Sequence, residues 1–309
     1  MEILHEQQES NIELIYRGKV RDVYNISSNL LAMVHSDRLS AFNKHVCKVS
    51  GKGSILTAIS KWWFEKTKDI IPNHYIWSKN NVMVCKKCKP FKVEIIVRGY
   101  ITGSLWNNYS KGIRNYCGVS FPDNLVKNQI LDNPVITPTT KDDDDLPISK
   151  DDIIKEGYMT QQQWDYINNK AIELFKYGQT VADSVGLLLV DTKYEFGIDN
   201  NGNILLIDEI HTCDSSRYWI KDTYSLNREP DILDKDIIRN YIRSKCNPYT
   251  DTFPSIPDRL ITETYNVYKK LYCTLNPKNC DTLGPVVDSA NSCNINKIID
   301  SYYNDIHNN

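Results

Sequence analysis

The chain has 309 residues, of which 41% are apolar and 25% are charged, and its formal net charge is −2. The length suffices for one large domain or for two lobes around a cleft, and the composition is that of an ordinary globular protein. The near-neutral charge argues against a protein that binds nucleic acid over a broad basic surface, while it allows a local basic cleft for phosphate groups.

Neither the apolar runs nor the start of the chain indicates contact with a membrane. The longest apolar runs, such as residues 185–190, are too short to span a bilayer. Residues 1–6 are acidic and lack the apolar region of a signal peptide. We therefore expect a cytosolic protein.

The nine cysteines are scattered along the chain. Without a secretion signal, they predict reduced thiols. Cys85 and Cys88 form a single CxxC, and neither a second CxxC nor a His pair follows at a suitable spacing. We interpret it as coincidence rather than as half of a zinc site.

The first ninety residues predict short strands joined by turns, at residues 14–16, 23–24 and 30–34. Apolar residues at helical spacing predict a helix over residues 57–66. The stretch 92–101 is rich in β-branched residues and predicts a further strand.

The segment 120–146 is rich in Pro, Asn and Asp, and we interpret it as a functional loop because strongly patterned segments flank it. A strand at residues 187–195, a turn at 199–202 and a returning strand at 204–210 predict a β-hairpin. Helices are predicted on both sides of this hairpin, at residues 150–157, 160–185, 234–245, 258–272 and 295–303.

The hairpin gathers charged side chains. Alternate residues of a strand share a face, so Asp191, Lys193 and Glu195 should point the same way. Asp208 on the returning strand should come close to Glu195 across the ladder. Two acids and a lysine suit a magnesium–nucleotide site, where the lysine neutralises charge that develops during phosphoryl transfer. A solvated polar face with a cross-strand ion pair is equally compatible with the hairpin alone.

The segment after the returning strand combines an acid, two hydroxyls and an arginine, in Asp214, Ser215, Ser216 and Arg217. An apolar strand that runs into such a loop is typical of ligand-binding loops, and arginine suits a fixed phosphate or carboxylate. The alternative is an ordinary turn with a surface arginine. His211, in the same segment, is expected to be structural.

Two glycine-containing corners are candidate phosphate sites. Gly18, Lys19 and Arg21 lie in a turn between two strands, where glycine allows the backbone to approach a phosphate closely. This is not a Walker loop, and a basic hairpin turn is the alternative. Arg98 and Ser104 lie where a strand leads into a helix, which offers either a phosphate cradle or an ordinary corner.

Four consecutive acids, residues 142–145, follow Lys141. Such a run is usually a solvated loop or a patch that attracts cations weakly. Taken together, the motifs indicate a protein that binds a nucleoside triphosphate, a metal and a second anionic substrate.

At these motifs the chain resembles the SAICAR synthetase (phosphoribosylaminoimidazole-succinocarboxamide synthase) family. The pair DTKYEFG and DEIHTCDSSRYW at this spacing is highly specific for it. The matching stretches, in family order between residues 14 and 270, are RGKVRDVY, SDRLSAF, EIIVRGYITGSLW, TPTTKDDDDLPIS, DTKYEFG, DEIHTCDSSRYW and LDKDIIRNYI.

The resemblance implies a two-lobed α/β (α+β) fold related to ATP-grasp and kinase-like nucleotide binders, with ATP in the cleft between the lobes. It divides the chain into a β-rich lobe, residues 1–95, and an α/β lobe, residues 96–275. Residues 276–309 form an extension for which it suggests no role.

The resemblance also implies an ATP-dependent ligase of purine (IMP) biosynthesis, with magnesium, L-aspartate and carboxyaminoimidazole ribonucleotide (CAIR) as further ligands. The residues that match the ATP side are Gly18, Lys19, Arg21, Glu94 and Lys141. The catalytic matches are Lys193, Glu195 and Asp208, and the two acids match the magnesium ligands. The residues that match the imidazole-nucleotide side are Arg98, Ser104, Asp191, Asp214, Ser215, Arg217, Lys235 and Arg239.

The chain departs from the family pattern at three positions. Cys213 stands where the family usually has Pro, Asp144 where it often has His, and Asn43 where it often has Asp, whereas the GKG of residues 51–53 is preserved. These departures leave open a non-catalytic nucleotide-binding paralogue, and a small-molecule kinase on a related fold is the other alternative. For the ligase, we expect the γ-phosphoryl group of ATP to activate the CAIR carboxylate as an acyl phosphate and the aspartate amine to attack the carbonyl carbon, and the sequence allows either order of these two steps.

Overall fold

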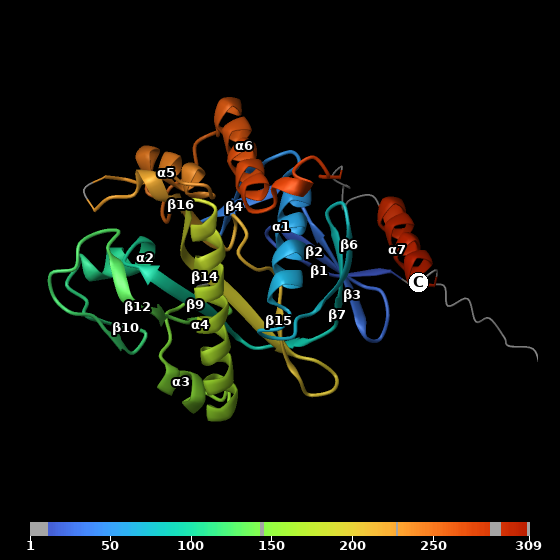
Figure 1. Ribbon diagram of the computed structural model, residues 1–309, viewed down its shortest axis with the longest axis horizontal. Helices are drawn as coiled ribbons and strands as arrows, with labels where there is room; N and C mark the ends of the chain where they lie inside the picture. Colours follow the sequence, from blue (N-terminus) through green and yellow to red (C-terminus); the bar gives the residue numbers. More distant parts are fainter. Residues whose placement is uncertain (1–11, 143–144, 227, 285–291, 308–309) are drawn as a thin grey trace, which may run out of the picture.

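The computed structural model describes residues 12–142, 145–226, 228–284 and 292–307. Residues 1–6, expected to form no signal peptide, and Asp144, one of the three departures, lie outside these described residues. The fold is mixed α/β, as predicted, and two β-sheets lie on either side of helix α1 (Lys52–Thr67) (Figure 1).

The first sheet is antiparallel, with the strand order β1-β2-β3-β7-β6. The turn from β1 to β2 is tight, because Gly18 N donates to Arg21 O at 2.7 Å and a Cβ at Gly18 would lie 2.9 Å from that oxygen. The strands are β1 (Glu13–Arg17), β2 (Arg21–Asn25), β3 (Leu30–His35), β6 (Tyr75–Lys79) and β7 (Val82–Lys86).

The second sheet is built around β14 (Leu187–Ile198), whose twelve residues pair with four other strands. Along this strand, Asp191 is in register with both Arg98 and Arg217. The other strands are β8 (Lys89–Pro90), β9 (Val93–Tyr100), β12 (Ile130–Ile136), β13 (Thr139–Thr140), β15 (Ile204–Ile207) and β16 (Ser216–Ile220). Two small hairpins stand apart, β4 (Arg38–Ala41) with β5 (Lys44–Lys48) and β10 (Asn115–Tyr116) with β11 (Val119–Ser120).

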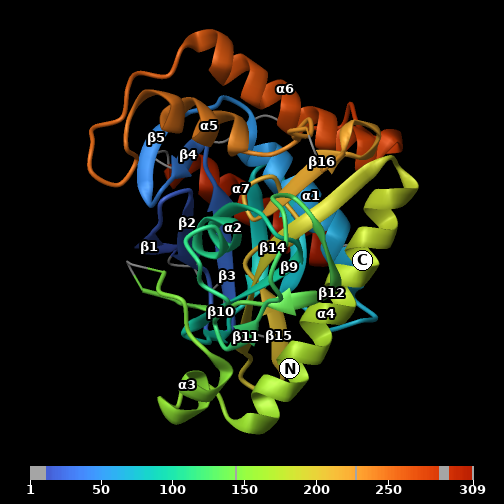
Figure 2. The ribbon, with the colours of Figure 1, turned by 90° about the vertical axis from the view of Figure 1, so that its left-hand side faces the viewer.

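Helices cover the sheets and complete one large core. The long helix α4 runs along the second sheet, while α5 and α6 lie together near the start of α1 (Figure 2). Trp63 of α1, Tyr194 of β14 and Tyr268 of α6 are fully buried in the same cluster. The remaining helices are α2 (Gly103–Tyr109), α3 (Lys150–Lys155), α4 (Gln161–Ser184), α5 (Asp236–Lys245), α6 (Asp258–Leu275) and α7 (Ser292–His307), with short 3-10 turns at η1 (Lys221–Thr223) and η2 (Pro277–Asn279).

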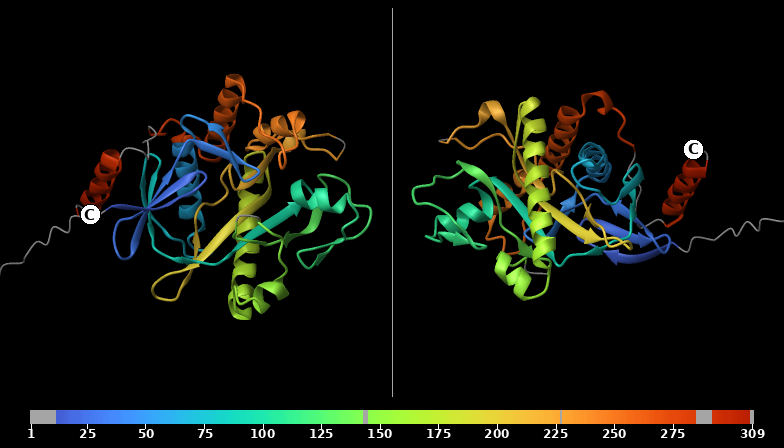
Figure 3. Two further views of the ribbon diagram at one scale, coloured as in Figure 1. Left: turned by 180° about the vertical axis from the view of Figure 1, so that it is seen from behind. Right: turned by 60° about the horizontal axis from the view of Figure 1, so that its bottom comes forward.

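Helix α7 lies beside the first sheet, away from the second (Figure 3). Its residues Ile295, Ile298, Ile299 and Tyr302 form a separate buried cluster with strands of that sheet. The extension that the sequence left without a role therefore covers an apolar face of the first sheet.

The elements with strong patterns are confirmed. The strand predicted at residues 30–34 is β3, that at 92–101 is β9, and the helix predicted at 160–185 is α4. A capping box explains the start of α4, because Thr160 and Gln163 exchange side-chain and backbone hydrogen bonds. The hairpin with its turn at residues 199–202 is also present.

The prediction that residues 120–146 form a loop is wrong in part. Strands β12 and β13 lie within it, and both pair with β9. The Pro134 of β12 fits because β12 is an edge strand with an irregular register. The pairing of Thr139 with Glu94 brings Lys141 to the end of β9.

Two predicted boundaries are also wrong. Helix α1 begins at Lys52 instead of Thr57, because the Asp37 carboxylate accepts hydrogen bonds from Gly51 N and Gly53 N at 3.1 and 3.0 Å. The returning strand of the hairpin ends at Ile207 rather than at residue 210. Asp208 has a φ of 71°, which is incompatible with a strand.

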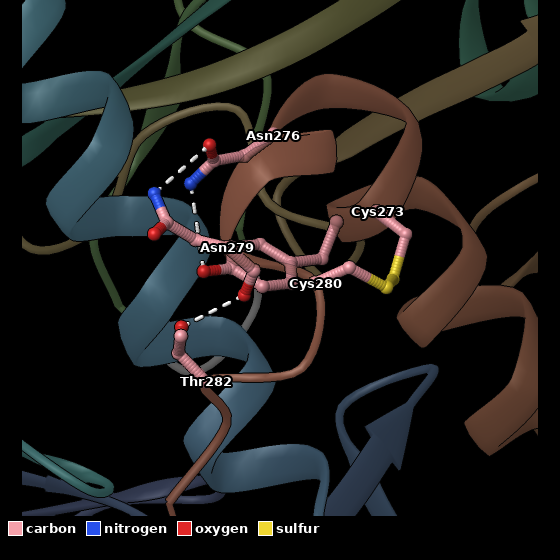
Figure 4. The surroundings of a disulfide bond; sticks show 6 residues. Cys273, Asn276, Asn279, Cys280 and Thr282 are labelled. Atoms are coloured by element: carbon pink, nitrogen blue, oxygen red, sulfur yellow. Dashed lines mark hydrogen bonds between the residues drawn. A yellow bond between two sulfur atoms is a disulfide. The ribbon is translucent and has the colours of Figure 1, made fainter.

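The prediction that all cysteines are reduced is wrong. Cys273 and Cys280 form a disulfide that closes the turn after α6 (Figure 4). In that turn Thr282 Oγ1 donates to Asn279 O at 2.7 Å. Cys85 is buried and Cys88 is partly exposed, and the described residues contain no group of three or more His, Cys, Asp or Glu side chains that could hold a metal. Within the described ranges, no helix has the length and apolar content needed to cross a membrane.

Candidate active site

Four charged side chains, here called the β14 cluster, meet where β13, β9 and β14 lie side by side. Lys193 Nζ lies 2.6 Å from Glu94 Oε1 and 2.7 Å from Glu195 Oε1. Lys141 contacts the other carboxylate oxygen of Glu195. Lys193 and Glu195 thus share a face of β14, as their alternation predicted.

The charges of the β14 cluster compensate one another. Burial alone would raise the pKa of Glu195, but Lys193 and Lys141 hold it well below its usual range. Burial raises the pKa of Glu94, although Lys193 opposes the rise. Glu195 is therefore ionised and lies between two ammonium groups.

The end of β15 meets the turn of the first sheet at Arg21. Arg21 Nη1 lies 2.8 Å from Asp208 Oδ1, and Nη2 lies 3.1 Å from Glu209 Oε1. Glu195 is in register with Ile207, so Asp208 follows one residue beyond it. The end of the hairpin thus contacts the turn that contains Gly18 and Arg21.

The second carboxylate oxygen of Asp208 fits a cation. Asp208 Oδ2 is buried and has no hydrogen-bond partner among the described residues. Burial raises the pKa of Asp208 to about 7, against the opposing effect of Arg21, and Glu195 adds to the rise. A magnesium ion would offset the cost of this buried negative charge, and carboxylate oxygens are its preferred protein ligands.

A second group of charges, here called the Asp191 cluster, surrounds the middle of β14. Arg217 Nη1 lies 2.5 Å from Asp191 Oδ2, and Arg98 Nη1 lies 3.6 Å from the same oxygen. Arg98 also donates to Ser104 Oγ at 3.1 Å. A Cβ at Gly103 would lie 2.6 Å from Arg217 Nη2, so only glycine leaves room for the guanidinium there.

Helix α5 completes the Asp191 cluster with an acid that the sequence reasoning missed. Asp236 Oδ2 accepts from Arg217 Nε at 2.8 Å, and Asp236 Oδ1 accepts from Arg239 Nη1 at 2.8 Å. Burial opposes ionisation of Asp236, but Arg217 and Arg239 hold its pKa far below the usual range. Asp236 lies in the matching stretch LDKDIIRNYI, which was the available signal.

A third group, the Asp214 cluster, lies between β15, α1 and α6. Asp214 receives hydrogen bonds from Lys52 Nζ and Tyr268 Oη, both at 2.7 Å. Burial, reinforced by Arg239, lowers the pKa of Lys235 to about 8, while Asp214 opposes this effect. Sequence reasoning missed Tyr268. Lys52 belongs to the preserved GKG, but no function was assigned to it.

Two further predicted site residues, Lys19 and Ser215, make no ion pair within the described part of the chain. Lys19 is exposed in the β1–β2 turn. Ser215 Oγ accepts from Thr212 N at 3.2 Å and is half-buried. His211 is fully buried and its Nε2 lies 2.5 Å from Tyr194 Oη, which agrees with a structural role.

Two of the departures from the family pattern can be described. Cys213 is fully buried in the main core. Asn43 has a φ of 60° in the β4–β5 turn, a conformation that asparagine tolerates well, and its Nδ2 donates to Asp145 Oδ2 at 2.9 Å. An aspartate at position 43 would instead place two negative charges together.

Comparisons with known proteins agree with the resemblance. Residues 14–256 match the family model described as SAICAR synthetase. A phosphoribosylaminoimidazole-succinocarboxamide synthase of Legionella pneumophila (strain Lens) is 48% identical over 268 residues, covering 83% of this chain and 86% of the relative. The chloroplastic synthase of Arabidopsis thaliana is 46% identical over 278 residues, covering 86% of this chain and 67% of the relative. A solved SAICAR synthase from Saccharomyces cerevisiae, complexed with SAICAR, has a TM-score of 0.77 at 28% identity and covers 88% of this chain and 97% of its own.

Proposed function

The chain belongs to the SAICAR synthetase family, and we propose that the three clusters around β14 are the active site of its reaction. The enzyme is an ATP-dependent carbon–nitrogen ligase of purine biosynthesis that joins L-aspartate to CAIR and yields SAICAR, ADP and phosphate. The observation that carries the proposed site is β14 itself. Asp191 and Glu195, four residues apart on this strand, belong to two different clusters, in which Asp191 pairs with arginines and Glu195 pairs with lysines.

The β14 cluster and the β1–β2 turn form the ATP side in this proposal. Gly18 and Lys19 lie in the turn, and Arg21 reaches from it to Asp208. Lys141 and Lys193 provide cations at Glu195 that can balance charge on a transferring phosphoryl group. Glu94 holds Lys193 from the neighbouring strand.

Glu195 and Asp208 would hold magnesium, whose charge neutralises phosphate oxygens when bound. The unpartnered oxygen of Asp208 supports this assignment. Arg21 contacts the other oxygen of Asp208, so it restrains the carboxylate and adds positive charge beside the proposed phosphate site.

The chemistry needs an activated carboxylate, because the oxide of a carboxylate is a very poor leaving group. A carboxylate oxygen of CAIR attacks the γ-phosphorus, the bond to ADP breaks, and an acyl phosphate forms. The neutral amine of aspartate then attacks the carbonyl carbon and loses a proton. Inorganic phosphate leaves with the former carboxylate oxygen, so one ATP is consumed for each amide bond.

The Asp191 and Asp214 clusters form the imidazole-nucleotide side. Arg98, Arg217, Lys235 and Arg239 supply positive charge for the CAIR phosphate, and Ser104 and Ser215 supply hydroxyls. Asp191 and Asp214 are acceptors for the imidazole amine and ribose hydroxyls. Without a ligand, Arg217 is paired with Asp191 and Asp236. In this proposal, the phosphate of CAIR replaces these carboxylates as the partner of Arg217 when it binds.

We also propose the predicted division into lobes 1–95 and 96–275 with an extension at 276–309, and a cytosolic location. The first sheet ends at Lys86 and the second begins at Lys89, which supports a boundary near residue 90. The contact between Arg21 and Asp208 crosses between the two sheets and supports ATP binding between them.

The proposal is tested with purified protein, ATP, magnesium, CAIR and L-aspartate, omitting one component at a time. We expect SAICAR, ADP and free phosphate in equal amounts, and none of them when any component is missing. Phosphate retained on the organic product would instead indicate a kinase. Ligand binding without any turnover would indicate the non-catalytic paralogue.

A further inference from the structure

Lys52 joins the two sides of the proposed active site. Its side chain is fully buried at the start of α1, and Nζ donates to Asp214 Oδ2 at 2.7 Å and to Arg38 O at 3.0 Å. We propose that Lys52 is a positioning residue for the ligation reaction, which fixes Asp214 on the CAIR side and the phosphate loop, residues 18–20, on the ATP side. This inference rests on the proposed function of the site.

On the CAIR side, Lys52 is one of two donors that hold the Asp214 carboxylate. The other is Tyr268 of α6, whose hydroxyl donates to Oδ1 at 2.7 Å. The Asp214 side chain is only 5% exposed, so solvent does little to hold it in place. The two donors therefore fix the direction of the carboxylate and favour its charged form.

On the ATP side, Lys52 acts through Arg38. The Arg38 carbonyl accepts from Lys52, while its guanidinium donates to Gly18 O at 3.0 Å and to Lys19 O at 3.2 Å. The same guanidinium lies 2.7 Å from the buried carboxylate of Asp22. The phosphate loop is thus attached by its own backbone to the residue that Lys52 restrains.

The position of Lys52 argues against a purely stabilising role. A cation in the first turn of a helix lies near the positive end of the helix dipole, and burial of an ion pair seldom stabilises a fold better than apolar packing. Two contacts fix the backbone on both sides of Lys52. Asp37 caps the helix at Gly51 and Gly53, and a Cβ at Gly53 would lie 2.3 Å from His35 O.

The electrostatic effect of Lys52 gives a specific readout. Burial would raise the pKa of Asp214, and Lys52 is the first of the cations that lower it. Without Lys52, the pKa of Asp214 should rise. As the pH falls, a variant that lacks Lys52 should therefore lose binding of the imidazole nucleotide at a higher pH than the wild type does. The titratable or charged groups that face Asp214 are Lys52, Tyr268, Lys235, Arg21, His35 and Cys213.

The test compares Lys52→Met and Lys52→Gln with Asp214→Asn in the full-length protein. We expect both Lys52 variants to raise KM for CAIR and for ATP at least about tenfold, because hydrogen bonds to charged groups are lost on both sides. Asp214→Asn should raise KM for CAIR but not for ATP. The affinity for SAICAR is measured by calorimetry as a function of pH. Its decrease at low pH, here called the acid limb, should occur at higher pH in the Lys52 variants. The exposed Lys61 of the same helix supplies the control Lys61→Met, which should match the wild type.

Lys52→Met keeps nearly the length and volume of lysine without its charge, whereas Lys52→Gln is shorter and keeps a neutral donor, so the pair separates loss of charge from loss of packing. A folded Lys52→Gln variant with wild-type KM values and an unshifted acid limb would overturn the proposal. Failure of both variants to fold would also overturn it, because the role of Lys52 would then be structural. Absence of SAICAR formation by the wild type would instead refute the proposed function.

Discussion

Arg21 Nη1 lies 2.8 Å from Asp208 Oδ1, which joins the glycine turn of the first sheet to the end of the hairpin in the second. Only one oxygen of Asp208 is used in this way, since Oδ2 has no hydrogen-bond partner among the described residues. A carboxylate held at one oxygen and free at the other can accept a cation without moving. Arg21 therefore holds in place Asp208, one of the two proposed magnesium ligands.

Removal of either assigned magnesium ligand should abolish turnover while the fold survives. For Glu195→Ala and Asp208→Ala we expect kcat/KM to fall by at least about 100-fold, because charge stabilisation at the transferring phosphoryl group is lost. The assay is SAICAR formation at saturating magnesium, with circular dichroism to verify folding. The exposed Glu229 gives the control Glu229→Ala, expected to behave as wild type. Near-normal amide formation by either active-site variant would refute the metal assignment.

Arg217→Ala should weaken binding of the imidazole nucleotide far more than binding of ATP. Arg217 lies in the Asp191 cluster, and a lost charge-assisted hydrogen bond corresponds to roughly 10- to 100-fold in affinity. Calorimetric titration of SAICAR and of ADP measures the two effects separately. Arg114→Ala, at a partly exposed arginine paired with Asp123, serves as the control. Equal losses for both ligands would count against the assignment.

The affinity for CAIR should depend on pH through Lys235. Its pKa is lowered to about 8, so the side chain is charged below this pH and neutral above it. Because the charged form attracts the anionic ligand, kcat/KM for CAIR should be full below about pH 8 and fall as the pH rises through it. An arginine at position 235 keeps its charge across this range. In Lys235→Arg, the decrease of kcat/KM for CAIR at high pH, here called the basic limb, should therefore move to higher pH. An unchanged limb in Lys235→Arg would show that another group titrates.

Shortening a buried side chain of α7 should destabilise the protein without affecting catalysis. Ile299 is fully buried against the first sheet, and Ile299→Ala should lower the free energy of unfolding by about 2–5 kcal/mol. Urea denaturation measures this change, and kcat should remain that of the wild type. The exposed Lys297 of the same helix gives the control Lys297→Ala. A stability equal to that of the control would mean that α7 does not contribute to the core.

The sequence predicted those parts of the site that depend on local geometry. Alternation along β14 placed Lys193 and Glu195 on one face, and the hairpin turn brought Asp208 close to them. Lys52 and Tyr268 could not be paired with Asp214 in this way, because 162 and 54 residues separate them from it along the chain. Only the packing of α1 and α6 onto the second sheet brings these three residues together.

Local signals also misled where a distant residue decided the outcome. The start of α1 depends on Asp37, fifteen residues before Lys52, and β12 forms because β9 offers a free edge. The disulfide between Cys273 and Cys280 depends on the turn after α6, which an odd count of cysteines does not reveal. These features arise from tertiary contacts rather than from residue patterns.

The most direct test of the account follows the oxygen atoms of the CAIR carboxylate. CAIR labelled with ¹⁸O in this group is incubated with the protein, ATP, magnesium and L-aspartate, and the inorganic phosphate is analysed by mass spectrometry. If the γ-phosphoryl group of ATP is transferred to a carboxylate oxygen of CAIR, each phosphate released should contain one ¹⁸O atom. Phosphate without the label, formed alongside SAICAR, would contradict the account.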